Sequence, residues 1–346
     1  MRPILRHLTL PLIAGLGLLS SPLVAADEEL DTLRFGIIST ESSQNQAPLW
    51  RPFLDDMAES LGVEVEPFFA NDYAAVIQAM RFDQIDLAWY GNKSAMEAVD
   101  RADGEVFAQT VSANGDVGYW GLIIVNQESP YETIDEVLAD ADELIFANGD
   151  PNSTSGYLVP GYYIFAQRDI DPNTAFRHTL NANHETNALS VANGQVDVAT
   201  FFSEGLERLK QTNPAAAEKL RVVWTSPLIP SDPLVWRQAL PEELKTNLRN
   251  FLFEYGETDE QREVLAGLQW SLFQPSDNDQ LLPIRQLELF KERATIAGDD
   301  SLAAETRESR LAELDAQLDD LNIRLEAREA ANAEQDAAGV TTAMAQ

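Results

Sequence analysis

From Leu33 to about Val235 the sequence alternates short β-rich runs with amphipathic helical runs, and this alternation restricts the fold more than any other feature. The expected strands are Leu33–Ile38, Val63–Phe69, Ile85–Trp89, Val106–Val111, Trp120–Val125, Leu144–Phe146, Val196–Thr200 and Leu220–Trp224. The expected helices between them are Pro48–Leu61, Ala74–Phe82, Ser94–Arg101, Ile134–Leu138, Ser155–Gln167, Glu185–Asn193 and Glu204–Lys210. This order predicts an α/β fold with mostly parallel sheets. Such sheets bind ligands beyond the carboxyl ends of their strands.

The chain after Asp232 is rich in helical patterns. The expected helices there are Pro241–Tyr255, Glu260–Ala266 and Gln280–Ile296. A further helix is expected at 301–328, where five leucines are spaced alternately three and four residues apart: Leu311, Leu314, Leu318, Leu321 and Leu325. This stripe is typical of a coiled coil, and it fits either a helix packed on its own body or a homodimer contact. Residues 329–346 are small and polar, and we expect them to be disordered.

The first residues have the pattern of a secretory signal peptide. Two arginines precede an apolar run from Leu8 to Leu19, and Val24 and Ala26 place small residues at the cleavage positions. The run is shorter than the ~20 residues that span a bilayer. We therefore expect residues 1–26 to be removed after Ala26 and the protein to be periplasmic. The chain contains no cysteine, so its stability must come from burial. A chain of this length usually divides into two lobes.

The formal net charge is −33, which argues against nucleic-acid partners because these require clustered Lys and Arg. It also disfavours anionic membranes. The expected signal segment contains two arginines and no acidic residue, so the exported chain is more acidic still. An anionic ligand would therefore have to be attracted by local groups.

The most specific segment follows the strand expected to end at Phe146. A turn rich in Asn, Gly, Asp and Pro leads into Ser153, Thr154 and Ser155 at the start of a helix. Helix starts present unpaired N–H groups and a partial positive charge, so three hydroxyls there suit a tetrahedral oxyanion. The alternative is an ordinary N-cap, which needs one hydroxyl. Pro160 lies inside the expected helix and would kink it or delay its start.

Aromatic and acidic side chains lie beside other strand ends. Tyr73, Tyr90 and Tyr119 could each donate to an oxyanion or simply pack in the core. Glu204 follows an expected strand, and Asp232 lies at an expected crossover between lobes. Carboxylates suit a ligand ammonium better than a phosphoryl group. In so acidic a chain, however, each is also readily explained as a solvated surface group.

Motifs for catalysis, metals and cofactors are missing. The exported chain would keep only His178 and His184, too few for a zinc site by themselves, and there is no His/Cys cluster. No nucleophile elbow, Walker A loop or dinucleotide fingerprint is present. We therefore expect no cofactor and no enzymatic activity.

Seven segments, in order, resemble the phosphonate-binding periplasmic proteins of ABC transporters, a family of type II periplasmic binding proteins. They are residues 35–45, 67–82, 86–111, 149–163, 183–200, 224–237 and 281–291. The resemblance implies a two-lobe clamshell that binds its ligand in the cleft and delivers it to a membrane permease. The implied lobes are residues 27–118 plus 236–300 and residues 119–235.

The resemblance also implies roles for individual residues. The phosphonate head would meet Ser153, Thr154 and Ser155, with Tyr73 and Tyr119 closing over it and His184 adding a donor. Glu204 and Asp232 match positions that meet the amino group of 2-aminoethylphosphonate. Phe201 and Phe202 depart from the more polar residues expected in the family, and they would suit alkyl groups.

Other functions compete with an aminoalkyl- or alkylphosphonate receptor. A receptor of the same fold for phosphite or phosphate would gain nothing from the acidic pair. A secreted phosphoryl-transfer enzyme would need an activated nucleophile or a metal. A structural protein using the C-terminal helix would leave the seven segments unexplained.

Overall fold

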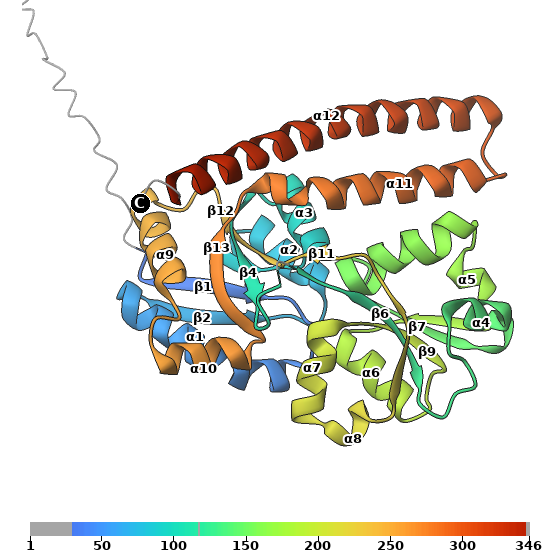
Figure 1. Cartoon of the computed structure of the whole chain (residues 1–346), viewed down its shortest axis with the longest axis horizontal. Helices are drawn as coiled ribbons and strands as arrows, with labels where there is room; N and C mark the ends of the chain where they lie inside the picture. Colours follow the sequence, from blue (N-terminus) through green and yellow to red (C-terminus); the bar gives the residue numbers. More distant parts are fainter. Residues whose placement is uncertain (1–29, 117, 344–346) are drawn as a thin grey trace, which may run out of the picture.

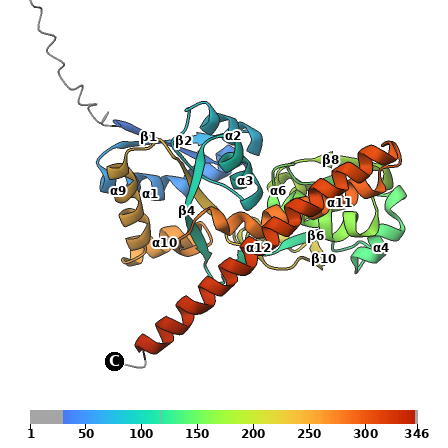
Figure 2. The ribbon, with the colours of Figure 1, turned by 90° about the horizontal axis from the view of Figure 1, so that it is seen from above.

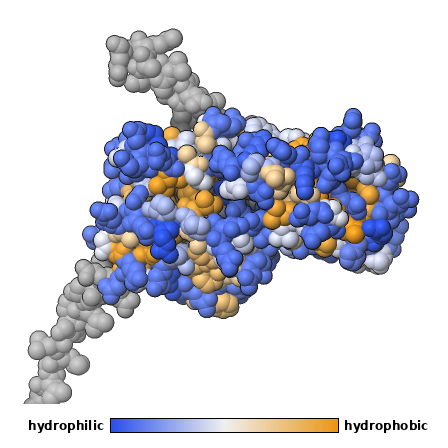
Figure 3. Space-filling model, turned by 90° about the horizontal axis from the view of Figure 1, so that it is seen from below, coloured by the Kyte–Doolittle hydropathy of each residue, from blue (hydrophilic) through white to orange (hydrophobic). Residues whose placement is uncertain are grey.

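The computed structural model describes residues 30–116 and 118–343 and has two lobes, each built on its own sheet (Figure 1). The α/β class expected from the strand–helix alternation is confirmed. Residues 1–26 and the expected cleavage after Ala26 lie outside the described residues. Hydrophilic residues cover most of the face seen in Figure 3, with apolar residues in smaller patches. Within the described ranges, no helix has the length and apolar character needed to cross a membrane.

The first lobe contains a six-stranded sheet in the order β13-β4-β12-β3-β1-β2. Its strands are β1 (Thr32–Ile37), β2 (Glu64–Phe69), β3 (Leu87–Trp89), β4 (Gly104–Ser112), β12 (Pro233–Arg237) and β13 (Trp270–Pro275). Its helices are α1 (Ser43–Leu61), α2 (Tyr73–Arg81), α3 (Asn92–Arg101), α9 (Glu242–Glu254), α10 (Asp259–Gly267) and η5 (Asn278–Leu281). An aromatic cluster that includes Trp50, Phe53 and Trp270 fills the core beside this sheet.

The second lobe contains a five-stranded sheet in the order β10-β6-β9-β7-β8. Its strands are β6 (Gly121–Asn126), β7 (Ile145–Asn148), β8 (His178–Asn181), β9 (Val198–Phe202) and β10 (Leu220–Thr225). Its helices are α4 (Ile134–Ala139), η1 (Ala141–Glu143), η2 (Thr154–Leu158), η3 (Gly161–Phe165), η4 (Ala166–Arg168), α5 (Pro172–Ala175), α6 (His184–Ala192), α7 (Ser203–Thr212) and α8 (Pro214–Ala217). Phe146, Phe165 and Phe176 pack together in a separate apolar cluster.

Two crossover segments join the lobes and pair with each other as β5 (Gly118–Tyr119) and β11 (Ile229–Pro230). The sheets are mixed, so the expectation of mostly parallel sheets is wrong. β1 pairs in parallel with β2 and β3, whereas β12 runs antiparallel to β3 and β4. The reason is the crossover: the chain re-enters the first lobe at the carboxyl end of β3, so β12 must run back along that strand.

Each of the eight expected strands is present, with ends shifted by at most a few residues. α1 begins at Ser43 rather than at Pro48, because its first turns accommodate both Pro48 and Pro52. The helical run that starts at Thr154 continues to Arg168 without a break. Two wide π-helical turns, η2 and η3, flank Pro160, which has no N–H to give to a regular ladder.

The C-terminal segment forms a hairpin of α11 (Leu282–Gly298) and α12 (Ala304–Ala343) (Figure 1). Leu314, Leu318 and Leu321 are buried, and Arg293 on α11 pairs with Asp315 on α12 at 2.5 Å. The leucine stripe therefore packs on the body of its own chain. α12 continues to Ala343, beyond residue 328, because this stretch is rich in strong helix formers such as Ala and Glu. Its last turns project past the lobes in Figure 2.

Candidate ligand-binding site

The candidate site lies where strand ends from both lobes meet. β2 is followed by α2, which begins at Tyr73; β7 is followed by η2, which begins at Thr154; and β8 is followed by α6, which begins at His184. Three of the residues expected to bind a ligand are therefore the first residues of helices. Such positions lie beside unpaired N–H groups and the positive end of the helix dipole. These helix starts can therefore bind an anion even though no basic side chain takes part.

The three consecutive hydroxyl residues are all buried at this junction. Ser153 is an N-cap, since its Oγ accepts a hydrogen bond of 3.0 Å from the N–H of Gly156. Thr154 does something else: its Oγ1 accepts a hydrogen bond of 2.9 Å from the N–H of Lys93, which belongs to the first lobe. Each hydroxyl still has its own proton to donate. Ser153 is therefore an ordinary N-cap, but capping does not explain Thr154.

His184 and Tyr73 surround Ser153. The Nε2 atom of His184 lies 3.3 Å from the Oγ of Ser153, and the Ser153 side chain also acts on the phenol of Tyr73, whose pKa it lowers. Burial lowers the pKa of His184 to about 3, so its imidazole is neutral at pH 7. Burial also raises the pKa of Tyr73, and the nearby Asp150 and Asp232 raise it further. This end of the site is therefore lined by neutral hydrogen-bonding groups.

The acidic pair adjoins these groups, and the charge of Asp232 acts on Tyr73. Asp232 is buried and accepts a hydrogen bond of 2.9 Å from the hydroxyl of Tyr119 and a longer one of 3.4 Å from the amide of Asn92. Burial, reinforced by the charge of Glu204, raises the pKa of Asp232 well above its usual range. Burial raises the pKa of Glu204 to about 7, against the opposing effects of the Arg208 charge and of a hydrogen bond with Ser112.

Neither carboxylate has a cationic partner. Among the ion pairs formed by residues 30–116 and 118–343, none includes Glu204 or Asp232. Arg208, the guanidinium that lowers the pKa of Glu204, is itself paired with Glu41 at 2.6 Å. The site thus has two neighbouring carboxylates that are costly to ionise together unless a cation arrives from outside.

Contacts between the lobes enclose the site. The N–H of Tyr73 donates to Asp150 at 3.1 Å, and the N–H of Ser42 donates to Glu185 at 2.9 Å. Together with the bond between Lys93 and Thr154, these contacts join the first lobe to the second on several sides of the site. The lobes are therefore closed on each other.

Some groups at the site were not expected from the sequence, and the structure decides between the two interpretations of Tyr90. Asn92 and the N–H of Lys93 open α3, directly after β3, and the same rule about strand ends would have found them. Ser112 lies at the end of β4 and has no signal of its own. Tyr90 is a packing residue, since its hydroxyl donates to the carbonyl of Val76 at 3.0 Å inside the first lobe.

The part of the chain that the structure describes contains no group of three or more His, Cys, Asp or Glu side chains arranged to hold a metal ion. The chemistry available at the site is therefore hydrogen bonding to an anion at one end and ion pairing with a cation at the other.

Residues 35–281 match a family model described as ABC transporter, phosphonate, periplasmic substrate-binding protein. The chain is 54% identical over 297 residues to the phosphonates-binding periplasmic protein of Escherichia coli strain K12, covering 86% of this chain and 88% of that protein.

Solved structures with the same architecture include close and distant relatives. The binding-protein component of an ABC phosphonate transporter from Pseudomonas aeruginosa has 59% identity and a TM-score of 0.85, covering 86% of this chain and 99% of that one. A protein from Prochlorococcus marinus in complex with methylphosphonate has 21% identity and a TM-score of 0.67, covering 74% and 97%. At that identity the second likeness supports the fold alone, and the two likenesses together confirm the expected two-lobe architecture.

Proposed function

This chain belongs to the family of periplasmic substrate-binding proteins of phosphonate ABC transporters, and from that premise we propose that its preferred ligand is 2-aminoethylphosphonate. The family consists of receptors rather than enzymes, so the chain is a periplasmic receptor that serves a membrane permease. The narrower proposal concerns which phosphonate it carries and which residues bind it.

We assign the phosphonate head to the end of the site lined by Ser153, Thr154, Ser155, Tyr73 and His184. The convergence of three helix starts and the neutral hydroxyl, phenol and imidazole donors support this assignment. It also accounts for anion binding by so acidic a protein, because dipoles and hydrogen bonds act at short range whereas the net charge is screened by salt over ~10 Å.

We assign the ligand ammonium to the end formed by Asp232 and Glu204, with Tyr119 fixing one oxygen of Asp232. The observation that carries the proposal is a buried Asp232 beside a half-buried Glu204, with neither carboxylate paired to a basic side chain in the described part of the chain. A buried charge of this kind is normally paired. An ammonium two carbons from the phosphonate would supply the missing partner, whereas phosphate or phosphite would add more negative charge.

We also propose cleavage after Ala26, the lobe limits given above, and a homodimer contact made by the C-terminal helix. The leucines that suggested a dimer pack on α11 instead. The projecting last turns of α12 are therefore the part of this helix that remains for a second copy (Figure 2).

Calorimetry on protein lacking residues 1–26 tests the ligand. We expect 2-aminoethylphosphonate to bind at least about tenfold more tightly than ethylphosphonate, since a desolvated carboxylate–ammonium contact is worth more than the ~1.4 kcal/mol that a factor of ten requires. Phosphite and phosphate should bind more weakly than either. Equal affinities for the two phosphonates would contradict the amine assignment. Tighter binding of phosphate would point to an inorganic oxyanion receptor instead.

A further inference from the structure

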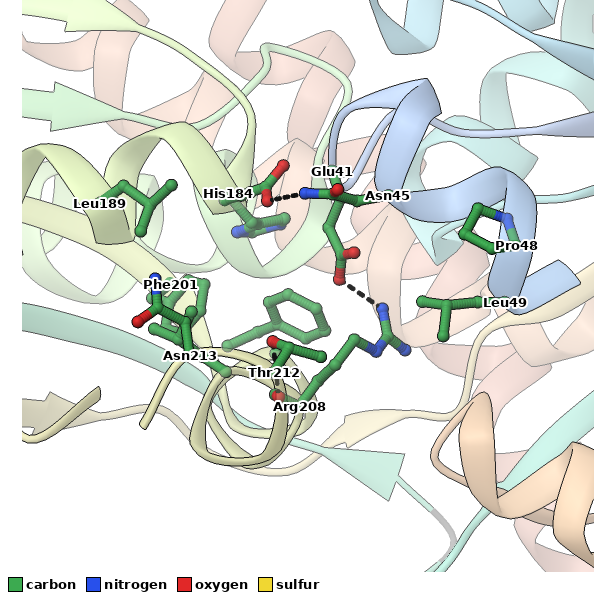
Figure 4. A pocket seen from close by; sticks show the side chains of 14 residues that line it. Glu41, Asn45, Pro48, Leu49, His184, Leu189, Phe201, Arg208, Thr212 and Asn213 are labelled. Carbon is green, nitrogen blue, oxygen red and sulfur yellow. Dashed lines mark hydrogen bonds and ion pairs between the residues drawn. The ribbon is translucent and has the colours of Figure 1, made fainter. Parts of the chain in front are cut away.

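A cavity of about 460 Å³ lies between the two lobes, and His184 of the candidate site is one of its lining residues (Figure 4). We call it the outer chamber. The first lobe contributes Glu41, Asn45 and Leu49 to its wall, and the second contributes Leu189, Arg208 and Asn213. Its volume falls within the ~300–1,000 Å³ typical of small-molecule sites. It is therefore large enough to receive part of a ligand.

His184 and Phe202 lie between the outer chamber and the candidate site. Both line the chamber, and their ring centroids are 4.5 Å apart. On the other side, His184 contacts Ser153 at 3.3 Å, and the ring of Phe202 lies 6.2 Å from that of Tyr119 in an edge-on arrangement. Phe202 thus touches the groups assigned to both ends of the ligand while its ring is buried.

Gly205, one turn along α7, holds the ring of Phe202 in this place by having no side chain. A Cβ atom added at Gly205 would lie 2.3 Å from Cε1 and 2.8 Å from Cδ1 of Phe202. These distances are far below van der Waals contact, so any other residue there would push the ring aside. Glycine at 205 and phenylalanine at 202 therefore form a matched pair.

We infer that Phe202, seated on Gly205, is a specificity-determining partition: it closes the ligand site off from the outer chamber and so limits the length of the phosphonate's substituent. This inference rests on the proposed function. Short substituents fit on the near side of the ring, whereas a longer alkyl chain collides with it. On the far side, apolar side chains including Leu49 and Leu189 offer the chain a surface to pack on.

Removing the ring tests the partition. In the unmutated protein, hexylphosphonate should bind at least about tenfold more weakly than ethylphosphonate. Phe202→Ala should improve hexylphosphonate by at least about tenfold, since each added methylene can then be buried. The readout is the ratio of the hexylphosphonate and ethylphosphonate affinities, because the ring packs on His184 and Tyr119 and its loss also acts on ethylphosphonate. Gly205→Ala displaces the same ring without removing it and should shift the preference in the same direction.

Leu189→Ala is the matched control, because it enlarges the outer chamber without opening the partition and should leave both affinities unchanged. Phe202→Leu replaces Phe202→Ala if the smaller residue prevents folding. Equal binding of hexylphosphonate and ethylphosphonate by the unmutated protein would overturn the partition, as would an unaltered preference in both the Phe202 and Gly205 variants. Failure of the unmutated protein to bind either 2-aminoethylphosphonate or ethylphosphonate would instead overturn the proposed function.

Discussion

Two buried aspartates lie at opposite ends of the same pair of strands, β3 and β12, and their surroundings differ in kind. Asp86 precedes β3 and is bound by Arg34 at 2.8 Å and by Arg237 at 2.6 Å. Asp232 precedes β12 at the other end of the pair and meets only the neutral Tyr119 and Asn92 side chains. Asp86 is paired with two arginines, whereas Asp232 forms no ion pair among the residues that the structure describes.

The pKa directions follow this difference. Burial would raise the pKa of Asp86, but the hydrogen bonds and charge of Arg34 together with Arg237 outweigh it, so the pKa is lowered. For Asp232, burial and the charge of Glu204 act in the same direction and raise the pKa. A buried carboxylate with internal cations stabilises the fold, whereas one without them costs stability that ligand binding can recover.

The largest effect should come from Asp86. We expect Asp86→Asn to lower the free energy of unfolding by ~3–5 kcal/mol, because it leaves two arginines partly buried without their partner. Thermal unfolding of the unliganded protein measures this. Since the pKa of Asp86 is lowered on folding, its contribution is present above the ordinary value of 3.8 and is lost as the pH falls below it.

Asp83→Asn is the matched control for this experiment. Asp83 binds the same Arg237 at 2.8 Å, but its side chain is 74% exposed. Exposed pairs contribute little, so this variant should unfold almost at the normal temperature. Equal losses for the Asp83 and Asp86 variants would contradict the structural role assigned to Asp86.

For Asp232 we expect a loss of ligand affinity without a loss of stability. Asp232→Asn should weaken 2-aminoethylphosphonate by ~2–5 kcal/mol, because the ammonium loses its buried partner. Ethylphosphonate should bind as before or slightly better, and the unliganded protein should be no less stable. Calorimetry and thermal unfolding of the same preparation give both answers. A variant that unfolds early and loses both ligands equally would make Asp232 a structural residue like Asp86.

The sequence predicted the position of the three hydroxyls at a helix start better than it predicted the contrast between these aspartates. Three hydroxyls after a strand have a local physical meaning, and the α/β order follows from hydrophobic periodicity. Asp86 and Asp232 each lie in an ordinary acidic sequence, and only the long-range pairing of β3 with β12 reveals which one meets arginine. The expectation of mostly parallel strands was wrong for the same reason, since the path of the chain through the crossover is not a local property of the sequence.

β8 and β13 were not expected because polar residues interrupt their apolar pattern.

Thr154 should affect every phosphonate alike. We expect Thr154→Val to reduce affinity for 2-aminoethylphosphonate and ethylphosphonate by the same factor, at least about tenfold, since a hydrogen bond to a charged group contributes ~1.5–3 kcal/mol. The change also removes the acceptor for the N–H of Lys93 across the lobes. Joint replacement of Ser153 and Ser155 by Ala should act in the same way. Unchanged affinities in calorimetry would reduce the hydroxyls to caps.

A smaller effect is expected from pH. Glu204 has a pKa of about 7 in the unliganded protein and binds an ammonium only when ionised. Affinity for 2-aminoethylphosphonate, relative to ethylphosphonate at the same pH, should therefore fall by about tenfold from pH 8 to pH 6. Both ligands carry the same phosphonate group, so the effect of its ionisation on the affinity cancels in this ratio. In Glu204→Gln the ratio should depend less on pH, with the remaining slope due to Asp232, whose pKa burial also raises. An unchanged slope in this variant would exclude Glu204 as its origin.

The same raised pKa has the reverse effect on folding. The stability associated with protonated Glu204 is fully present below the ordinary value of 4.5 and is lost as the pH rises through about 7. The unliganded Glu204→Gln variant should therefore gain stability over the unmutated protein as the pH is raised from 6 to 8. Thermal unfolding at the two pH values measures the difference.

The smallest effect on ligand binding should follow removal of the residues after Arg328. This truncation keeps the part of α12 that packs on α11, including Leu314 and Leu321, and so leaves the body of the protein covered. A cut at Ser301 would instead expose the apolar face of α11. Because the removed turns project away from both lobes (Figure 2), the affinity for 2-aminoethylphosphonate should not change. Light scattering should show a dimer before truncation and a monomer after it; a monomeric full chain at tens of micromolar would exclude the dimer contact.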